Sequence, residues 1–275
     1  MSQNSVLPSH FSFFYILLVL SVLDLWKNAM YNSLLRFLKA ATDLILPRRC
    51  IVCDRTLLLD EKHICLNCLC DMPLTYFWKQ LYNPMADRFN AAICDADLDA
   101  CGYVQACALF FYDSKGSYKQ IPYQLKYSAN ISAGRFFGQM LGERMVAQEH
   151  WKDVDCIIPV PLHWRRKWKR GYNQVEVIAE AVARALNAEL RCDVLLKSRY
   201  TRTQTQMDID RKLQNVKGSF NIARESGPFP YNHILIIDDT FTTGSTLLSC
   251  YETLIHHLPS NTRISIATLG YVGNA

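Results

Sequence analysis

The sequence predicts an α/β protein in which a mostly parallel sheet carries helices on both faces, preceded by a small cysteine-rich module. From residue 106 onward, short apolar runs alternate with segments of helical periodicity, and this alternation is typical of right-handed βαβ units. Nearer the N-terminus, five of the eleven cysteines fall between Cys50 and Cys70. In a chain of 275 residues this clustering favours a metal site over a disulfide framework.

Three parts are expected along the chain. Residues 1–29 are an N-terminal extension or a weak apolar anchor, residues 30–80 hold a lead-in helix and the cysteine module, and residues 100–275 form the sheet domain. The apolar run at residues 11–23 has 13 residues, which is short for a membrane span, and no Lys or Arg precedes it. We therefore expect no stable membrane span and a translation start at Met30 rather than Met1.

The sheet domain is predicted element by element from its apolar patterns. Strands are expected at residues 106–112, 155–160, 233–237 and 264–269. Helices are expected at residues 131–148, in the segment that begins near Val175, and in the segment from Leu247 to Leu258. Because ligands of parallel sheets bind at the carboxyl ends of the strands, the site is expected just after residues 160 and 237.

Positive charge is concentrated in two short segments. Residues 163–170 hold five basic residues and no acidic one, and residues 197–217 hold six basic and two acidic residues. The formal net charge of the whole chain is +5, so the rest of the chain is mildly acidic. Such clusters suit a phosphate-rich partner, either a small anionic ligand or nucleic acid.

Two CxxC pairs form the cysteine module. Each pair can place two thiolates on one edge of a tetrahedral Zn²⁺, and four thiolates fill its coordination sphere, so the predicted site is structural. The alternative is a set of buried cysteines that are paired only in sequence. Cys94 and Cys101 lack this spacing and are either core residues or remnants of a second pair. The predicted zinc ligands are Cys50, Cys53, Cys65 and Cys68.

The segment from Ile234 to Thr246 combines three features of a phosphate site. Four aliphatic residues precede two adjacent carboxylates, and a hydroxyl-rich turn with one glycine then opens a helix. The turn offers backbone N–H groups and a helix N-terminus to a phosphate monoester, and carboxylates can accept hydrogen bonds from vicinal hydroxyls. The alternative is a buried strand that leads into a capped helix with surface acids. The predicted ligand-binding residues are Asp238, Asp239, Thr240, Thr242, Thr243, Gly244, Ser245 and Thr246.

The basic segment between Pro159 and Gln174 is the second candidate. Arginine suits a diphosphate because its planar fork binds phosphate oxygens bidentately. The residues predicted to form a pyrophosphate loop are Pro161, Arg165 and Arg170, with Asn173 and Gln174 as hydrogen-bonding partners. Trp164 and Trp168 alternate with the basic residues. This pattern also fits a nucleic-acid surface, where aromatic rings stack on nucleobases.

These motifs carry a family resemblance. The Ile234–Thr246 segment resembles the phosphoribosyl-pyrophosphate (PRPP) motif of type I phosphoribosyltransferases, and the segment from Pro159 resembles the pyrophosphate loop of amidophosphoribosyltransferases. Together with the cysteine pairs and the polar stretch from Arg199, they occur in the order of the ComF family, which includes GntX-type proteins. The resemblance covers roughly residues 45–270. It implies the type I phosphoribosyltransferase fold, with Asp238 and Asp239 on the ribose hydroxyls and the turn after them on the 5-phosphate.

The resemblance also implies a function. It implies a cytoplasmic protein that binds PRPP, or another phosphoribosyl ligand, with Mg²⁺ and acts in natural transformation, handling incoming single-stranded DNA beside a competence helicase or recombination protein. It also implies a flexible loop that closes over PRPP, formed by Arg202, Thr205, Gln206 and Arg211; the alternative is a solvated surface loop.

Catalysis is left open by the sequence. No side chain has the pattern of an obligatory nucleophile, so the catalytic residues are unknown, and a phosphoribosyltransferase activity is an open expectation. Two alternatives stand beside it. The first is a non-catalytic nucleic-acid-binding accessory protein that retains the fold, and the second is a nucleotide- or base-salvage phosphoribosyltransferase.

Overall fold

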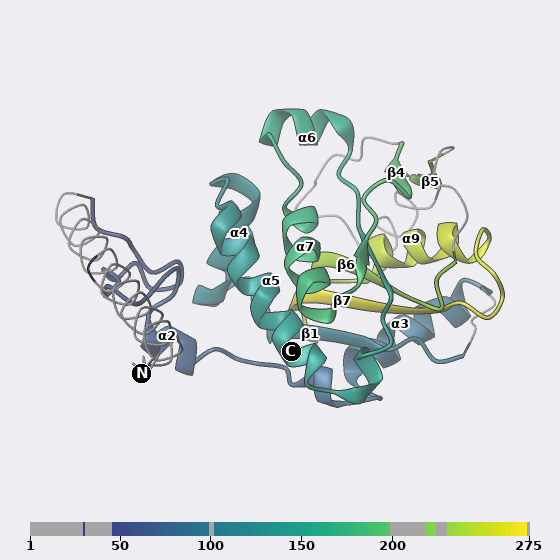
Figure 1. The fold of residues 1–275 in the computed structure, drawn as a ribbon, viewed down its shortest axis with the longest axis horizontal. Helices are drawn as coiled ribbons and strands as arrows, with labels where there is room; N and C mark the ends of the chain where they lie inside the picture. Colours follow the sequence, from purple (N-terminus) through teal and green to yellow (C-terminus); the bar gives the residue numbers. More distant parts are fainter. Residues whose placement is uncertain (1–29, 31–45, 99–101, 199–217, 224–229, 274–275) are drawn as a thin grey trace, which may run out of the picture. The chain divides into compact units, whose positions relative to one another are not determined.

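The computed structural model describes residue 30 and residues 46–98, 102–198, 218–223 and 230–273 (Figure 1). The predicted N-terminal extension and nearly all of the predicted lead-in helix lie outside these residues. The chain divides into a small N-terminal unit and a larger unit that contains the sheet. Among the helices that the structure describes, none has both the length and the apolar content that crossing a membrane requires.

The larger unit is built on a five-stranded sheet in which every pairing is parallel. The strand order is β1-β7-β6-β2-β3. The strands are β1 (Ala106–Phe111), β2 (Cys156–Pro159), β3 (Glu189–Leu190), β6 (His233–Phe241) and β7 (Arg263–Tyr271). A separate antiparallel pair is formed by β4 (Leu195–Lys197) and β5 (Phe220–Ile222). The sheet strands β1, β2, β6 and β7 are almost wholly buried, as expected where helices cover both faces.

Helices cover the sheet on both sides (Figure 1). On one face, α5 (Ile131–Val146) and α7 (Gln174–Leu186) pack against each other and against the strands. On the other face lie α3 (Pro84–Asp95) and α9 (Ser245–Ile255). The shorter helices are α2 (Leu66–Cys70), α4 (Gln120–Tyr127), α6 (Trp164–Arg170), η1 (Phe77–Lys79), η2 (Ser117–Lys119) and η3 (Glu149–Trp151). The predicted fold class is confirmed.

Glycines let α5 approach α7 closely. A Cβ atom at Gly138 would lie 2.7 Å from the carbonyl oxygen of Ile178, and one at Gly142 would lie 2.6 Å from the Cβ of Ala185. Both distances are shorter than real Cβ contacts, so these positions admit no side chain unless the two helices move apart. The packing of α5 therefore fixes the depth at which α7 lies on the sheet.

Strand β6 runs further than the sequence indicates. It was expected to end at Ile237, but it continues to Phe241 because β7 extends beside it, with Thr240 paired to Gly270 and Phe241 paired to Tyr271. Asp238 and Asp239 consequently lie within the strand rather than after it. Helix α9, which follows β6, stops at Ile255, whereas its predicted apolar stripe continued to Leu258.

Candidate functional site

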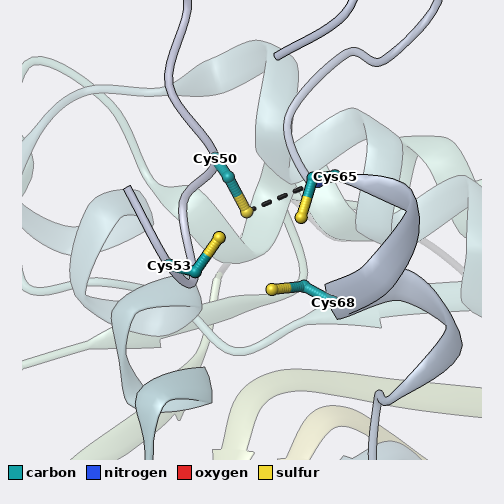
Figure 2. A group of neighbouring side chains, drawn as sticks. All are labelled: Cys50, Cys53, Cys65 and Cys68. Atoms are coloured by element: carbon teal, nitrogen blue, oxygen red, sulfur yellow. Dashed lines mark hydrogen bonds between the residues drawn. The ribbon is translucent and has the colours of Figure 1, made fainter. Parts of the chain in front are cut away.

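The four predicted cysteine ligands come together (Figure 2). Their Sγ atoms all lie within 4.8 Å of one another, and Figure 2 shows the sulfurs directed toward a common centre. Zn–S bonds of about 2.3 Å in a tetrahedron put neighbouring sulfurs about 3.8 Å apart, so the cluster fits a metal ion of this size. The cluster could therefore hold zinc.

Backbone hydrogen bonds shape the two cysteine turns. The amide of Cys50 donates to the carbonyl of Arg55 at 2.8 Å, which closes the first turn. The carboxylate of Glu61 accepts the amides of Leu58 and Leu66, each at 2.7 Å. These bonds lower the pKa of Glu61 and secure the start of α2, which carries the last cysteine.

The predicted phosphate turn joins β6 to α9. Gly244 has φ +78°, and a Cβ atom there would lie 2.7 Å from the ring of Phe241, so glycine is required both by conformation and by space. The hydroxyl of Thr243 donates to the hydroxyl of Ser245 at 3.0 Å. The turn thus leads directly into the N-terminus of α9, where backbone N–H groups favour an anion.

Arg88 of α3 supports this turn from its outer side. Its guanidinium donates to the carbonyl oxygen of Thr242 at 2.9 Å and to that of Val272 at 2.8 Å, and it lies 5.5 Å from the ring centroid of Phe241. Arg88 was not singled out from the sequence, where it is one charged residue in an ordinary amphipathic helix. It is a positioning residue for the phosphate turn.

Asp239 is buried and both of its carboxylate oxygens are engaged. Oδ1 lies 3.1 Å from the Nζ of Lys126 on α4, and Oδ2 accepts a 2.7 Å hydrogen bond from Gln174, the first residue of α7. Burial works against the charge of Lys126, but the attraction of Asp239 and Asp238 outweighs it and raises the pKa of Lys126 above its ordinary value. Lys126 therefore carries its positive charge at neutral pH and forms an ion pair with Asp239.

Asp238 has different surroundings. Successive side chains of a strand point to opposite sides, and Asp238 interacts electrostatically with Cys250 of α9 and Lys197 of β4. Burial, followed by the neighbouring charge of Asp239, raises the pKa of Asp238 to about 7. Burial also lowers the pKa of Lys197. The two adjacent carboxylates thus differ: Asp239 is bound by Lys126 and Gln174, whereas Asp238 has a raised pKa.

The predicted pyrophosphate loop contains a helix. Arg165 and Arg170 lie in α6, which begins after His163 and ends at Gly171 (φ +82°). The imidazole Nδ1 of His163 accepts the amide of Arg165 at 3.2 Å, and burial with the nearby cationic residues lowers the pKa of His163. This helix could not be predicted from apolar periodicity, because α6 has no buried residue and so no apolar stripe. Pro161 lies just before it.

A chain of hydrogen bonds connects α6 to the acidic pair. Arg170 donates to Oε1 of Gln174, and Nε2 of Gln174 donates to Asp239. The guanidinium of Arg170 also lies 5.8 Å from the ring centroid of Tyr127, next to Lys126 on α4. Gln174, predicted only as a local partner, is the residue through which the basic segment contacts the acids.

The structure brings together only part of the predicted site. The acidic pair, the phosphate turn, Arg170 and Gln174 are assembled at one edge of the sheet, whereas the predicted flexible-loop residues lie outside the described part of the chain: Arg202, Thr205, Gln206 and Arg211. Sequence reasoning missed Lys126 and Lys197. Lys126 is a single lysine in a segment without a motif, and Lys197 was counted only for charge, at the start of the basic segment 197–217. Only the topology places both lysines beside the carboxylates.

Comparison with curated proteins supports one family. No family model matches the chain. The chain is 37% identical to "Competence protein F" of Haemophilus influenzae over 93 residues, covering 34% of this chain and 41% of that protein. It is 31% identical to "DNA utilization protein YhgH" of Salmonella typhi over 138 residues, covering 49% and 60%. The matches span less than two thirds of each relative, and over the matched part they confirm the resemblance to the ComF family.

Two solved structures resemble the fold weakly. An adenine phosphoribosyltransferase from Leishmania tarentolae is 14% identical with a TM-score of 0.29, covering 60% of this chain and 78% of that one. The adenine phosphoribosyltransferase from Trypanosoma brucei is 12% identical with a TM-score of 0.31, covering 69% and 80%. The fold assignment rests on the parallel sheet and the helices that cover it.

Proposed function

We propose that this chain is a ComF-like phosphoribosyltransferase-fold protein that binds PRPP with Mg²⁺ and acts in the use of incoming DNA during natural transformation. The observation that carries the proposal is the junction of β6 and α9. There two adjacent carboxylates lie near the end of β6, and a glycine turn with four hydroxyl residues, at positions 242, 243, 245 and 246, then opens a helix. Residues 238–246 thus offer acceptors for two vicinal hydroxyls and donors for one phosphate.

Each part of the junction would have a defined task. The N-terminus of α9 and the hydroxyls of Thr243 and Ser245 would bind the 5-phosphate, and Asp238 and Asp239 would accept the ribose hydroxyls. Within the described part of the chain, the buried Oγ1 of Thr240 makes no hydrogen bond. A buried polar atom without a partner costs about 1–3 kcal/mol, and a bound hydroxyl could supply the missing partner.

The acidic pair has the oxygen donors that Mg²⁺ prefers. Both oxygens of Asp239 are already engaged by Lys126 and Gln174, so the metal would be held mainly by diphosphate oxygens of the ligand. We therefore expect Mg²⁺ to bind together with PRPP rather than ahead of it. When bound, it would neutralise the diphosphate, which Arg165 and other basic side chains would also face. The cysteine cluster would hold a structural zinc ion.

The role in DNA use rests on the curated relatives. Two of them are named "Competence protein F" and "DNA utilization protein YhgH". We propose that this chain likewise acts in the cytoplasm, beside a helicase or recombination protein, on the single strand that enters the cell. No nucleophile is assigned, because the described site contains carboxylates, lysines and hydroxyls but no activated nucleophile-base pair.

Calorimetric titration of the full chain with PRPP, with and without Mg²⁺, tests the ligand site. We expect saturable, Mg²⁺-dependent binding that falls at least about tenfold in Asp238→Asn/Asp239→Asn, since two acceptors for hydroxyls weaken. Asp95→Asn, an exposed acid at the end of α3, is the matched control and should bind like the parent. Unchanged PRPP affinity in the folded double variant would refute the assignment of the acids.

A further inference from the structure

A short helical segment of the larger unit contacts a predicted metal ligand at its start and an acid of the ligand site at its end. The part-buried hydroxyl of Tyr118, in η2, donates a 2.8 Å hydrogen bond to the carbonyl oxygen of Cys68. Both residues belong to the larger unit. Eight residues further along the chain, the Nζ of Lys126 lies 3.1 Å from Oδ1 of Asp239. The segment therefore connects the cysteine cluster to the acidic pair.

Helix α2, which carries Cys68, depends on the cluster for its position. It has five residues and buries none of them, and a helix of this length is not stable by itself in water. The carbonyl oxygen of Cys68 can hold Tyr118 only if α2 is itself held. A metal ion bound by the four cysteines supplies that restraint, because it joins α2 to the first cysteine turn.

The start of α4 depends in turn on Tyr118. Helix η2 leads into α4 without a break, since the amide of Gln120 donates to the carbonyl oxygens of Ser117 and Tyr118. η2 has no buried residue. Lys119, the N-cap residue of α4, makes no capping hydrogen bond with its side chain. The hydrogen bond from Tyr118 to Cys68 therefore restrains an end of α4 that has neither a buried anchor in η2 nor a side-chain cap.

The other end of α4 positions a charge in the ligand site. Lys126 lies in the last turn of the helix, and its ammonium group pairs with Asp239. Tyr118 and Lys126 are about 12 Å apart along the helix axis, at 1.5 Å per residue. Because α4 has eight residues, it depends on tertiary contacts at its ends. When its start opens, fewer turns remain to hold Lys126 beside the carboxylate.

We propose that Tyr118 transmits the metal-bound state of the cysteine cluster to the acidic site. With metal bound, α2 holds Tyr118, and α4 keeps the ammonium group of Lys126 beside Asp239. Without metal, α2 and the start of α4 open more often, so the ammonium group is less often in place. Tyr118 is thus a positioning residue that acts through Cys68 and Lys126. This link rests on the zinc ion and the ligand site of the proposed function and connects the two.

Hydrogen exchange of the full chain without ligand tests the link. In the zinc-loaded parent, chelation should raise amide exchange in α4 by at least about threefold, the effect of about one lost hydrogen bond. Zinc-loaded Tyr118→Phe should show the same rise while the cysteine turns stay protected, since it loses only the hydroxyl. Chelation of Tyr118→Phe should then add little in α4.

Tyr123→Phe is the matched control. It removes a hydroxyl from the same helix, and the side chain of Tyr123 is 54% exposed. Exchange in this variant should therefore follow the parent, with and without zinc. Exchange within β6 should stay slow in every arm, which separates opening of α4 from unfolding of the sheet.

Several results would overturn the proposal. They are α4 exchange that chelation leaves unchanged in the parent, parent-like α4 exchange in zinc-loaded Tyr118→Phe, a rise of equal size in Tyr123→Phe, or a parallel rise in β6. Metal analysis and PRPP titration of the parent identify which assignment has failed. A parent chain that binds zinc and PRPP but shows no coupled exchange refutes only the link, whereas a parent without zinc refutes the zinc assignment together with it.

Discussion

The cysteine cluster and the acidic site of this protein are assembled in opposite ways. All four cysteines come from residues 50–68, and two short turns are enough to bring them together. The acidic site instead draws Lys126, Gln174, Lys197 and Asp239 from four elements that are far apart in sequence. The first site is encoded by spacing within one segment, whereas the second exists only once the parallel sheet has formed.

This difference predicts how each site fails. A locally encoded metal cluster should be lost as one unit when a ligand or the metal is removed. A site assembled by the sheet should instead respond to single substitutions by graded changes in stability or affinity. The predictions below test this contrast, beginning with the largest expected effect.

Loss of a cysteine ligand should disrupt the cysteine module. Cys65→Ser, or removal of metal by a chelator, should abolish bound zinc and amide protection around residues 46–70, because structural zinc contributes on the order of 10 kcal/mol to small modules. Metal analysis measures the bound zinc, and hydrogen exchange measures the amide protection. Cys94→Ser, at an exposed cysteine outside the cluster, should change neither. Retention of one zinc per chain in Cys65→Ser would show that the cluster is not the zinc site.

Gly244→Ala should strain the phosphate turn. The new methyl group would meet the ring of Phe241 and the backbone would keep an unfavourable φ, so we expect about 2–4 kcal/mol of destabilisation in urea unfolding. Gly102→Ala separates the two causes. Its φ is +84° but nothing lies within 4 Å of its added Cβ, so it should lose only about 1 kcal/mol. Equal losses would mean that Phe241 moves aside without penalty.

Gln174→Ala should weaken the connection between α6 and the acids. Removing this buried amide leaves an oxygen of Asp239 without its donor, which should lower the free energy of unfolding by about 1–3 kcal/mol. Gln139→Ala is the matched control, because Gln139 donates an exposed hydrogen bond to Glu143 on the same helix. A similar small effect in both variants would indicate that water replaces the lost donor at Asp239.

Asp238 should make stability depend on pH near neutrality. Its pKa is raised to about 7 in the folded protein, so the folded state holds a proton that the unfolded chain releases at lower pH. The free energy of unfolding should therefore fall by about 1 kcal/mol as pH rises from about 4 to 7. Partial contact of the Asp238 carboxyl with water keeps this change small. Urea unfolding at several pH values measures it, and Asp238→Asn should flatten the profile. An unchanged profile in the variant would assign the dependence to another group.

Sequence reasoning predicted the parts of the molecule whose signal is local. The buried run before Asp238, the turn at Gly244 and the paired cysteines each carry a pattern within a few residues, and each is found where expected. The extension of β6 to Phe241 could not be predicted, because it depends on the length of β7 beside it. Lys126 resembles any surface lysine in sequence.

Helix α6 shows a second limit of prediction from the sequence. Helical periodicity is detected through an apolar stripe, and this helix buries nothing. Its boundaries are set instead by His163 at the start and by the left-handed conformation of Gly171 at the end. Arg165 and Arg170, predicted in a loop, therefore lie in a helix, and Arg170 is connected to Asp239 through Gln174.

The close approach of α5 and α7 has a consequence for how the ligand site could change over evolutionary time. Gly138 and Gly142 set the separation of α5 and α7, and the first residue of α7 is the amide donor to Asp239. A single added methyl group at either glycine would lift α7 and draw that donor away from the carboxylate. Ligand preference in this fold can thus be retuned by mutations buried between helices, and a search for altered specificity should sample these remote positions as well as the residues at the strand ends.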